Sequence, residues 1–229
     1  MNDSDGNDLG RRLEIGAILS TSMADIAANV VGFGGLALLL AVAGGSTDTY
    51  LPDVGNIVGN LALFFISVLA VYLTLRAKLG DDDIRPRFGA AFGFNLLSNL
   101  AILVGLILLI VPGLLIFVRW AVGLPALLRE NLSVSEAMAR SSILTEGNRW
   151  RILGLSLVIW GPFLLAMVLM GGLFTVFAGE ASLDMLPFNM LVNLAAGCAS
   201  ILSSVCWTEA YLALSGEDEG HQALAEIFA

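Results

Sequence analysis

Charged and reactive side chains are scarce in this chain of 229 residues. Only 14% of the residues are charged, with 11 Lys and Arg against 20 Asp and Glu, and there are one His and two Cys. The excess of acidic residues excludes a basic nucleic-acid-binding protein. The 57% apolar content excludes disorder of the chain as a whole. Ordinary soluble domains do not have this balance, so the composition indicates an integral membrane protein.

The same scarcity limits the chemistry that the chain can perform. No Ser-His-Asp set, Cys-His pair or metal cluster can be assembled within its apolar segments. Cys198 and Cys206 are eight residues apart, which is too far for a disulfide along one helix. We therefore predict no catalytic residue, no cofactor and no metal site. The acidic run Asp81–Asp83 is interpreted as a solvated loop beside basic residues, with divalent-cation binding as the alternative.

Six apolar segments are predicted to be membrane spans, for which a helix needs about 20 residues; the fourth is short for a full span, so local thinning of the bilayer or a position inside the bundle is expected. They cover about 24–45, 57–76, 88–111, 113–129, 150–178 and 186–214. Pro112 and Gly113 are predicted to form the tight turn that separates the third segment from the fourth. The predicted fold class is an all-α, six-span membrane domain over 13–214, between a polar disordered tail at 1–12 and an acidic tail at 215–229.

Basic residues fall on one side of this layout. Ten of the eleven Lys and Arg lie at 11–12, 76–87 and 129–151, whereas the connections 46–56, 112–113 and 179–185 contain none. The positive-inside rule therefore predicts that both termini are cytoplasmic.

A short interfacial helix is predicted ahead of the fifth span. Ser133 and Glu136 have the spacing of a capping box, and Gly147 is placed to end the helix. A second interfacial helix is expected near the N-terminus, because a shift of 119 residues aligns Ser22 with Ser141 and Asn29 with Asn148. The two copies form a weak parallel repeat.

The region 111–150 carries a specific set of residues: Val-Pro-Gly at 111–113, Arg119-Trp120, Leu124-Pro125-Ala126, and a loop with Glu130, Ser141, Gly147, Asn148, Arg149 and Trp150. This set resembles the membrane domain associated with glycerophosphoryl diester phosphodiesterases and related bacterial inner-membrane proteins. The resemblance implies a six-span unit in the bacterial inner membrane. The His-Arg-Gly opening and metal-binding carboxylates of the phosphodiesterase domain do not occur in this sequence, so we do not expect the enzyme activity to carry over.

Arg119 is the one basic residue inside a predicted span, about six residues from its outer end. A charge at that depth needs a partner or water. Asn60, Asn189 and Asn193 are candidate partners, and Asn95 and Asn99 share one face of the third span. Arg119 is interpreted as a structural pin or a guanidinium that reaches the headgroups, with recognition of an anionic group such as a lipid phosphate as the alternative.

The function expected from these features is non-enzymatic: a structural or accessory domain that contacts membrane lipids or a protein partner. One alternative is a transporter of lipid-like or small amphipathic solutes, which would need a hydrated cavity reaching Arg119, Asn95 and Asn99. A membrane-embedded lipid enzyme is the second alternative. The sequence indicates no nucleic-acid partner and leaves the oligomeric state open.

Overall fold

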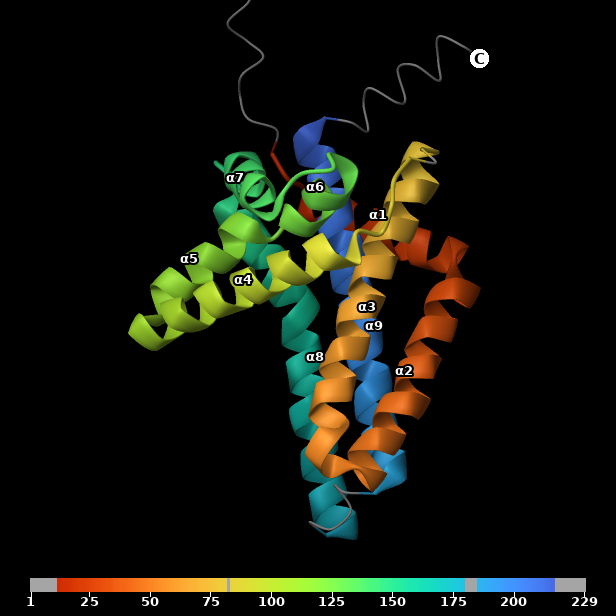
Figure 1. Ribbon diagram of the computed structural model, residues 1–229. Helices are drawn as coiled ribbons and strands as arrows, with labels where there is room; N and C mark the ends of the chain where they lie inside the picture. Colours follow the sequence, from red (N-terminus) through yellow and green to blue (C-terminus); the bar gives the residue numbers. More distant parts are fainter. Residues whose placement is uncertain (1–11, 82, 180–184, 217–229) are drawn as a thin grey trace, which may run out of the picture. The chain divides into compact units, whose positions relative to one another are not determined.

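The computed structural model describes residues 12–81, 83–179 and 185–216, and all regular structure within them is helical (Figure 1). The helices are α1 (Ile15–Ala28), α2 (Val30–Tyr50), α3 (Pro52–Leu79), α4 (Phe88–Leu108), α5 (Ile110–Trp120), α6 (Gly123–Arg129), α7 (Val134–Leu144), α8 (Arg149–Ala178) and α9 (Leu186–Ser215). Within the described residues, six stretches are long and apolar enough to cross a membrane: Val30–Tyr50, Pro52–Leu79, Phe88–Leu108, Ile110–Arg129, Arg149–Phe177 and Leu186–Ser215. The predicted all-α, multi-pass class is confirmed. The predicted tails, 1–12 and 215–229, lie almost wholly outside the described residues.

Contacts divide the described chain into two compact units. Unit 1 takes its residues from Met1–Thr21, Tyr72–Leu155 and Cys206–Ala229, and unit 2 consists of Ser22–Val71 and Ser156–Val205. The core of unit 2 is apolar and joins α2, α3 and α9 through Phe33, Ala37, Leu40, Ile66, Ala70, Ile201 and Val205. Every described Lys and Arg belongs to unit 1.

The first two spans are joined more tightly than the sequence predicts. The expected connection 46–56 is helical except at Leu51, since α2 continues to Tyr50 and α3 begins at Pro52. The hydroxyls of Thr47 and Thr49 donate to the carbonyls of Gly44 and Gly45, which ties them into the last turns of α2. Proline suits the first position of α3, because that N–H would have no partner in the helix.

The turn between the third and fourth spans lies at Leu109, so the predicted turn at Pro112 and Gly113 is wrong. Leu109 is extended, with φ −165° and ψ 143°, and α5 begins at the next residue. Pro112 sits in the first turn of α5, where a missing N–H costs no hydrogen bond. Gly113 instead lies against Gly105 of α4, where a Cβ on Gly105 would stand 2.8 Å from the Cα of Gly113.

The fourth span is also interrupted, because α5 ends at Trp120 and α6 starts at Gly123. Phe94 of α4 packs so closely on Gly123 that a side chain there would overlap its ring. Most of α6 is buried, including Pro125 and Leu127. The Leu-Pro-Ala segment of the sequence thus forms a short buried helix beyond α5.

The capping box at the start of α7 is confirmed. The Ser133 hydroxyl accepts from the Glu136 N–H, and the Glu136 carboxylate accepts from the Ser133 N–H at 2.8 Å. The Ser133 hydroxyl also donates to this carboxylate at 2.6 Å. This bond, followed by the one from the Ser133 N–H, holds the pKa of Glu136 below its usual value. Gly147 has φ +80°, the left-handed conformation that suits glycine after a helix.

The helix boundaries agree with the internal repeat. Helices α1 and α7 begin at Ile15 and Val134, and α2 and α8 begin at Val30 and Arg149; both offsets are 119 residues. The aligned residues Ser22 and Ser141 are both fully buried. Each copy is therefore a short helix followed by a long apolar one.

Candidate functional site

Side-chain hydrogen bonds in unit 1 hold together segments that are far apart in the sequence. Asn148, which precedes α8, accepts the N–H of Leu13 on its Oδ1 at 3.0 Å. Arg151 donates from Nη1 to the carbonyl of Leu13 at 2.7 Å. Both polar backbone groups of Leu13 are thus bound by side chains at the start of α8.

Glu130, directly after α6, is the centre of a second set of contacts. Its carboxylate accepts the Nε–H of Arg140 in α7, at 2.8 and 3.1 Å. It also accepts the hydroxyl of Tyr211 in α9, at 3.0 Å. Tyr211 is fully buried, whereas Glu130 is about one quarter exposed, at 24% of its side chain. This carboxylate therefore joins α6, α7 and α9 in unit 1.

The last turn of α5 is held by α7. The buried Ser141 donates to the carbonyl of Arg119 at 2.8 Å, and Thr145 donates to the same oxygen at 3.4 Å. That carbonyl lies near the end of α5, where the helix supplies no N–H partner. The two hydroxyls satisfy it and fix α7 across the end of α5.

The sequence places Arg119 about six residues from the outer end of its span. In the structure the turn lies at Leu109, so Arg119 is ten residues from it. Its side chain is exposed, and its position in the last turn of α5 is favourable for a positive charge. This placement fits the interpretation of a guanidinium that reaches polar surroundings. A pairing of Arg119 with an asparagine stays a prediction.

The predicted asparagines make other contacts. In unit 2, Asn189 donates to the Thr49 hydroxyl at 2.9 Å and Asn193 donates to the Asp48 carboxylate at 2.8 Å. These bonds hold α9 against the end of α2. In α4, Asn99 donates to the carbonyl of Asn95, one turn earlier. In unit 1, the buried Glu209 of α9 pairs with Lys78 of α3 at 3.4 Å.

The other residues of the family-like region, Gly147, Arg149 and Trp150, lie around the start of α8. Gly147 makes the turn into Asn148, and Trp150 is 85% exposed in the first turn of the helix. An exposed tryptophan at the end of an apolar helix is typical of the membrane–water interface. Arg149 has a buried Nε with no hydrogen-bond partner among the described residues.

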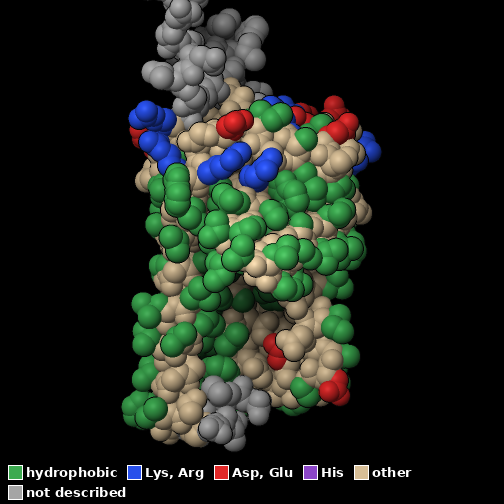
Figure 2. Space-filling model, turned by 90° about the vertical axis from the view of Figure 1, so that its left-hand side faces the viewer, with side chains coloured by type: hydrophobic (Ala, Val, Ile, Leu, Met, Phe, Trp, Pro, Cys, Tyr) green, Lys and Arg blue, Asp and Glu red, His purple; other side chains and the backbone are tan. Residues whose placement is uncertain are grey.

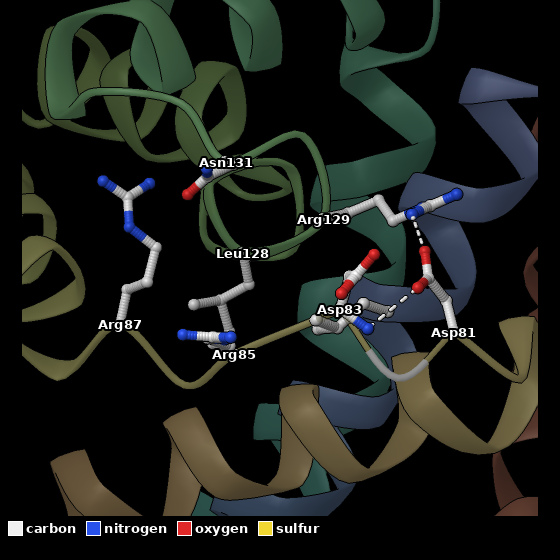
Figure 3. Close-up of a pocket in the computed structure, with 8 residues that line it drawn as sticks. Asp81, Asp83, Arg85, Arg87, Leu128, Arg129 and Asn131 are labelled. Atoms are coloured by element: carbon white, nitrogen blue, oxygen red, sulfur yellow. Dashed lines mark hydrogen bonds and ion pairs between the residues drawn. The ribbon is translucent and has the colours of Figure 1, made fainter.

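A pocket of about 510 Å³ lies between the α3–α4 and α6–α7 connections of unit 1 (Figure 3). It is lined by Asp81, Asp83, Ile84, Arg85, Arg87, Leu128, Arg129 and Asn131. Arg129 donates from Nη1 to Asp81 at 2.7 Å, and Arg87 donates from Nη1 to the Leu132 carbonyl at 2.7 Å. Asp81, predicted to be part of a solvated loop, is thus half of an ion pair in the pocket wall.

Sequence reasoning missed this pocket. Its arginines were assigned only to the inner side of the membrane, and their association depends on a contact between two connections about 45 residues apart. The mixed run of acidic and basic residues at 81–87 was the signal available in the sequence. Figure 2 shows Lys and Arg side chains gathered in one band on the face drawn, next to hydrophobic side chains.

Long apolar helices joined by short connections, with a hydrogen-bonded polar region, define a multi-pass helical membrane domain. The chain belongs to the family of membrane domains of glycerophosphoryl diester phosphodiesterase: the family model matches residues 91–206, just over half of the chain. The match includes Glu130, Arg140, Ser141 and Asn148, so the resemblance seen in the sequence is confirmed. Neither a search of curated proteins nor a search of solved structures gave a match.

Proposed function

We propose that this protein is a non-enzymatic domain of the bacterial inner membrane with both termini in the cytoplasm. Its role is structural or accessory, in contact with membrane lipids or a partner protein. The proposal is carried by the hydrogen bonds that polar residues of the family-like region 111–150 make. Glu130, Ser141 and Asn148 each bind a group of another chain segment, so they serve to hold helices together.

The distribution of charge supports the proposed orientation. All described Lys and Arg lie in unit 1. Among them, Arg129 contacts the α3–α4 connection, Arg87 contacts the α6–α7 connection, and Arg151 contacts the backbone of Leu13. Cytoplasmic loops of inner-membrane proteins have such an excess of basic residues.

Topology can be tested with alkaline phosphatase, which is active only outside the cytoplasm. Fusions after Tyr50 and after Ala178 are expected to be active, and fusions after Leu79 and after Leu144 inactive. These positions end α2, α8, α3 and α7, respectively. The measurement is the alkaline phosphatase activity of whole cells, divided by the amount of fusion protein they contain. An inactive fusion after Tyr50, or an active one after Leu144, would contradict the proposed orientation.

Absence of catalysis is tested with the purified full chain in a mild detergent. Incubation with a panel of phospholipids and glycerophosphodiesters, with and without divalent cations, is expected to release headgroups no faster than a heat-treated sample. Mass spectrometry of the reaction mixture is the measurement. A rate above the heat-treated control that follows the folded protein through size-exclusion chromatography would identify an enzyme and reject the proposal.

A further inference from the structure

The charges that line the pocket between the α3–α4 and α6–α7 connections do not cancel. Asp81 and Arg129 neutralise each other through their 2.7 Å ion pair. Asp81 also accepts the Asp83 N–H at 2.9 Å, so this pair is fixed in the wall. Asp83, Arg85 and Arg87 remain, with one negative and two positive charges.

The two remaining arginines have donors to spare. A guanidinium has five N–H donors, and Arg87 uses one nitrogen for the Leu132 carbonyl. The exposed Arg85 has no side-chain partner among the described residues. Two guanidinium groups with unused donors suit an anion with several oxygens, such as a phosphate.

The lining is divided into a basic and an acidic side. Figure 3 shows Arg85, Arg87 and Asn131 toward the left of the view, and Asp83 with the Asp81–Arg129 pair toward the right. A purely anionic ligand would meet the Asp83 carboxylate as well as the arginines. A ligand with a phosphate at one end and an ammonium at the other would match both sides.

The position of the pocket along the chain suits a lipid. Arg87 immediately precedes α4, whose N-terminus adds a favourable partial positive charge for a phosphate. Further along the chain, α4 exposes large apolar side chains at helical spacing, namely Phe92, Leu96, Leu100, Leu103 and Ile107. Acyl chains can lie along such side chains while the headgroup stays level with the arginines.

We propose that this pocket binds the zwitterionic headgroup of a membrane phospholipid, with the phosphate on Arg85 and Arg87 and the ammonium beside Asp83. Its volume of about 510 Å³ is within the usual range for a ligand pocket, roughly 300–1,000 Å³. This proposal identifies the lipid that the protein would contact, and it therefore rests on the lipid contact in the proposed function.

The test uses the full chain, delipidated in mild detergent and titrated with phosphatidylethanolamine or phosphatidylglycerol in native mass spectrometry. We expect the wild type to bind phosphatidylethanolamine more tightly. Arg85→Ala is expected to weaken this binding roughly tenfold, because a charge-assisted contact is lost. Arg12→Ala is the matched control: it removes an exposed arginine of unit 1 that does not line the pocket.

Asp83→Asn separates the zwitterionic proposal from simple anion binding. We expect it to abolish the preference for phosphatidylethanolamine while phosphatidylglycerol binds at least as well as before. An unchanged preference in Asp83→Asn, or equal losses in Arg85→Ala and Arg12→Ala, would overturn the proposal.

Soluble glycerophosphoethanolamine and inorganic phosphate distinguish a lipid from a free ligand. We expect neither to compete at concentrations comparable to the lipid. Binding of either one that depends on Arg85, without binding of the phospholipids, would overturn the lipid assignment. The non-enzymatic role and the orientation would survive that result, because headgroup release and fusion activity test them separately.

Discussion

Replacement of Gly105 by leucine is expected to prevent α4 from packing on α5 and to remove most of the folded protein from detergent extracts. A Cβ at Gly105 would lie 2.8 Å from the Cα and 2.9 Å from the N of Gly113. The clash is with backbone, which cannot rotate away as a side chain can. Overpacking usually costs about 1–3 kcal/mol, and a backbone contact between two helices belongs at the upper end or beyond.

Gly89 provides the matched control, because it lies in the same helix and a Cβ there would meet nothing within 4 Å. Gly89→Ala is expected to leave the thermal midpoint unchanged or slightly raised, whereas Gly105→Ala should lower it. Fluorescence-detected size-exclusion chromatography after heating measures both. A Gly105→Leu protein as stable as the wild type would show that α4 and α5 do not meet at this point.

Loss of the Glu130 carboxylate is expected to have the second-largest effect, lowering stability by about 2–4 kcal/mol. Glu130→Ala removes the carboxylate that accepts the hydroxyl of the buried Tyr211 and that is bound by Arg140. A hydrogen bond to a charged group contributes about 1.5–3 kcal/mol, and the partly exposed ion pair with Arg140 adds a smaller contribution. The thermal midpoint of the purified protein should fall by several degrees.

The control for this change is Glu146→Ala, since Glu146 is exposed and its side chain makes no hydrogen bond or ion pair with the described residues. Tyr211→Phe removes the hydroxyl together with its need for a partner, so it should cost less than Glu130→Ala. The double variant should be less destabilised than the sum of the two single changes, because they share one hydrogen bond. Strict additivity, or equal midpoints for Glu130→Ala and Glu146→Ala, would contradict the role given to Glu130.

Local signals in the sequence predicted much of this fold. Apolar length found all six candidate spans, and the Ser133–Glu136 spacing found the start of α7. The turn between α4 and α5 was misplaced because proline can either end a helix or occupy its first turn. Pro112 does the second, and the close approach of Gly105 and Gly113 that selects this arrangement is a tertiary contact.

The candidate site was predicted in part. The family resemblance selected Glu130, Ser141 and Asn148, all of which make long-range hydrogen bonds in the structure. Their partners could not be predicted from the sequence, because Tyr211 is 81 residues from Glu130 and the other two bonds are made with backbone groups. The sequence reveals which side chains are polar, but which carbonyl or N–H lacks a helical partner depends on where each helix ends.

The binding of Leu13 has a mechanical consequence. Its N–H and its carbonyl are both taken by side chains at the start of α8, Asn148 and Arg151. A pull on the chain ahead of residue 12 would therefore load the start of α8 before it could unwind α1. Because both bonds are made by backbone atoms of residue 13, they would transmit such a force for any residue there except proline, which has no N–H.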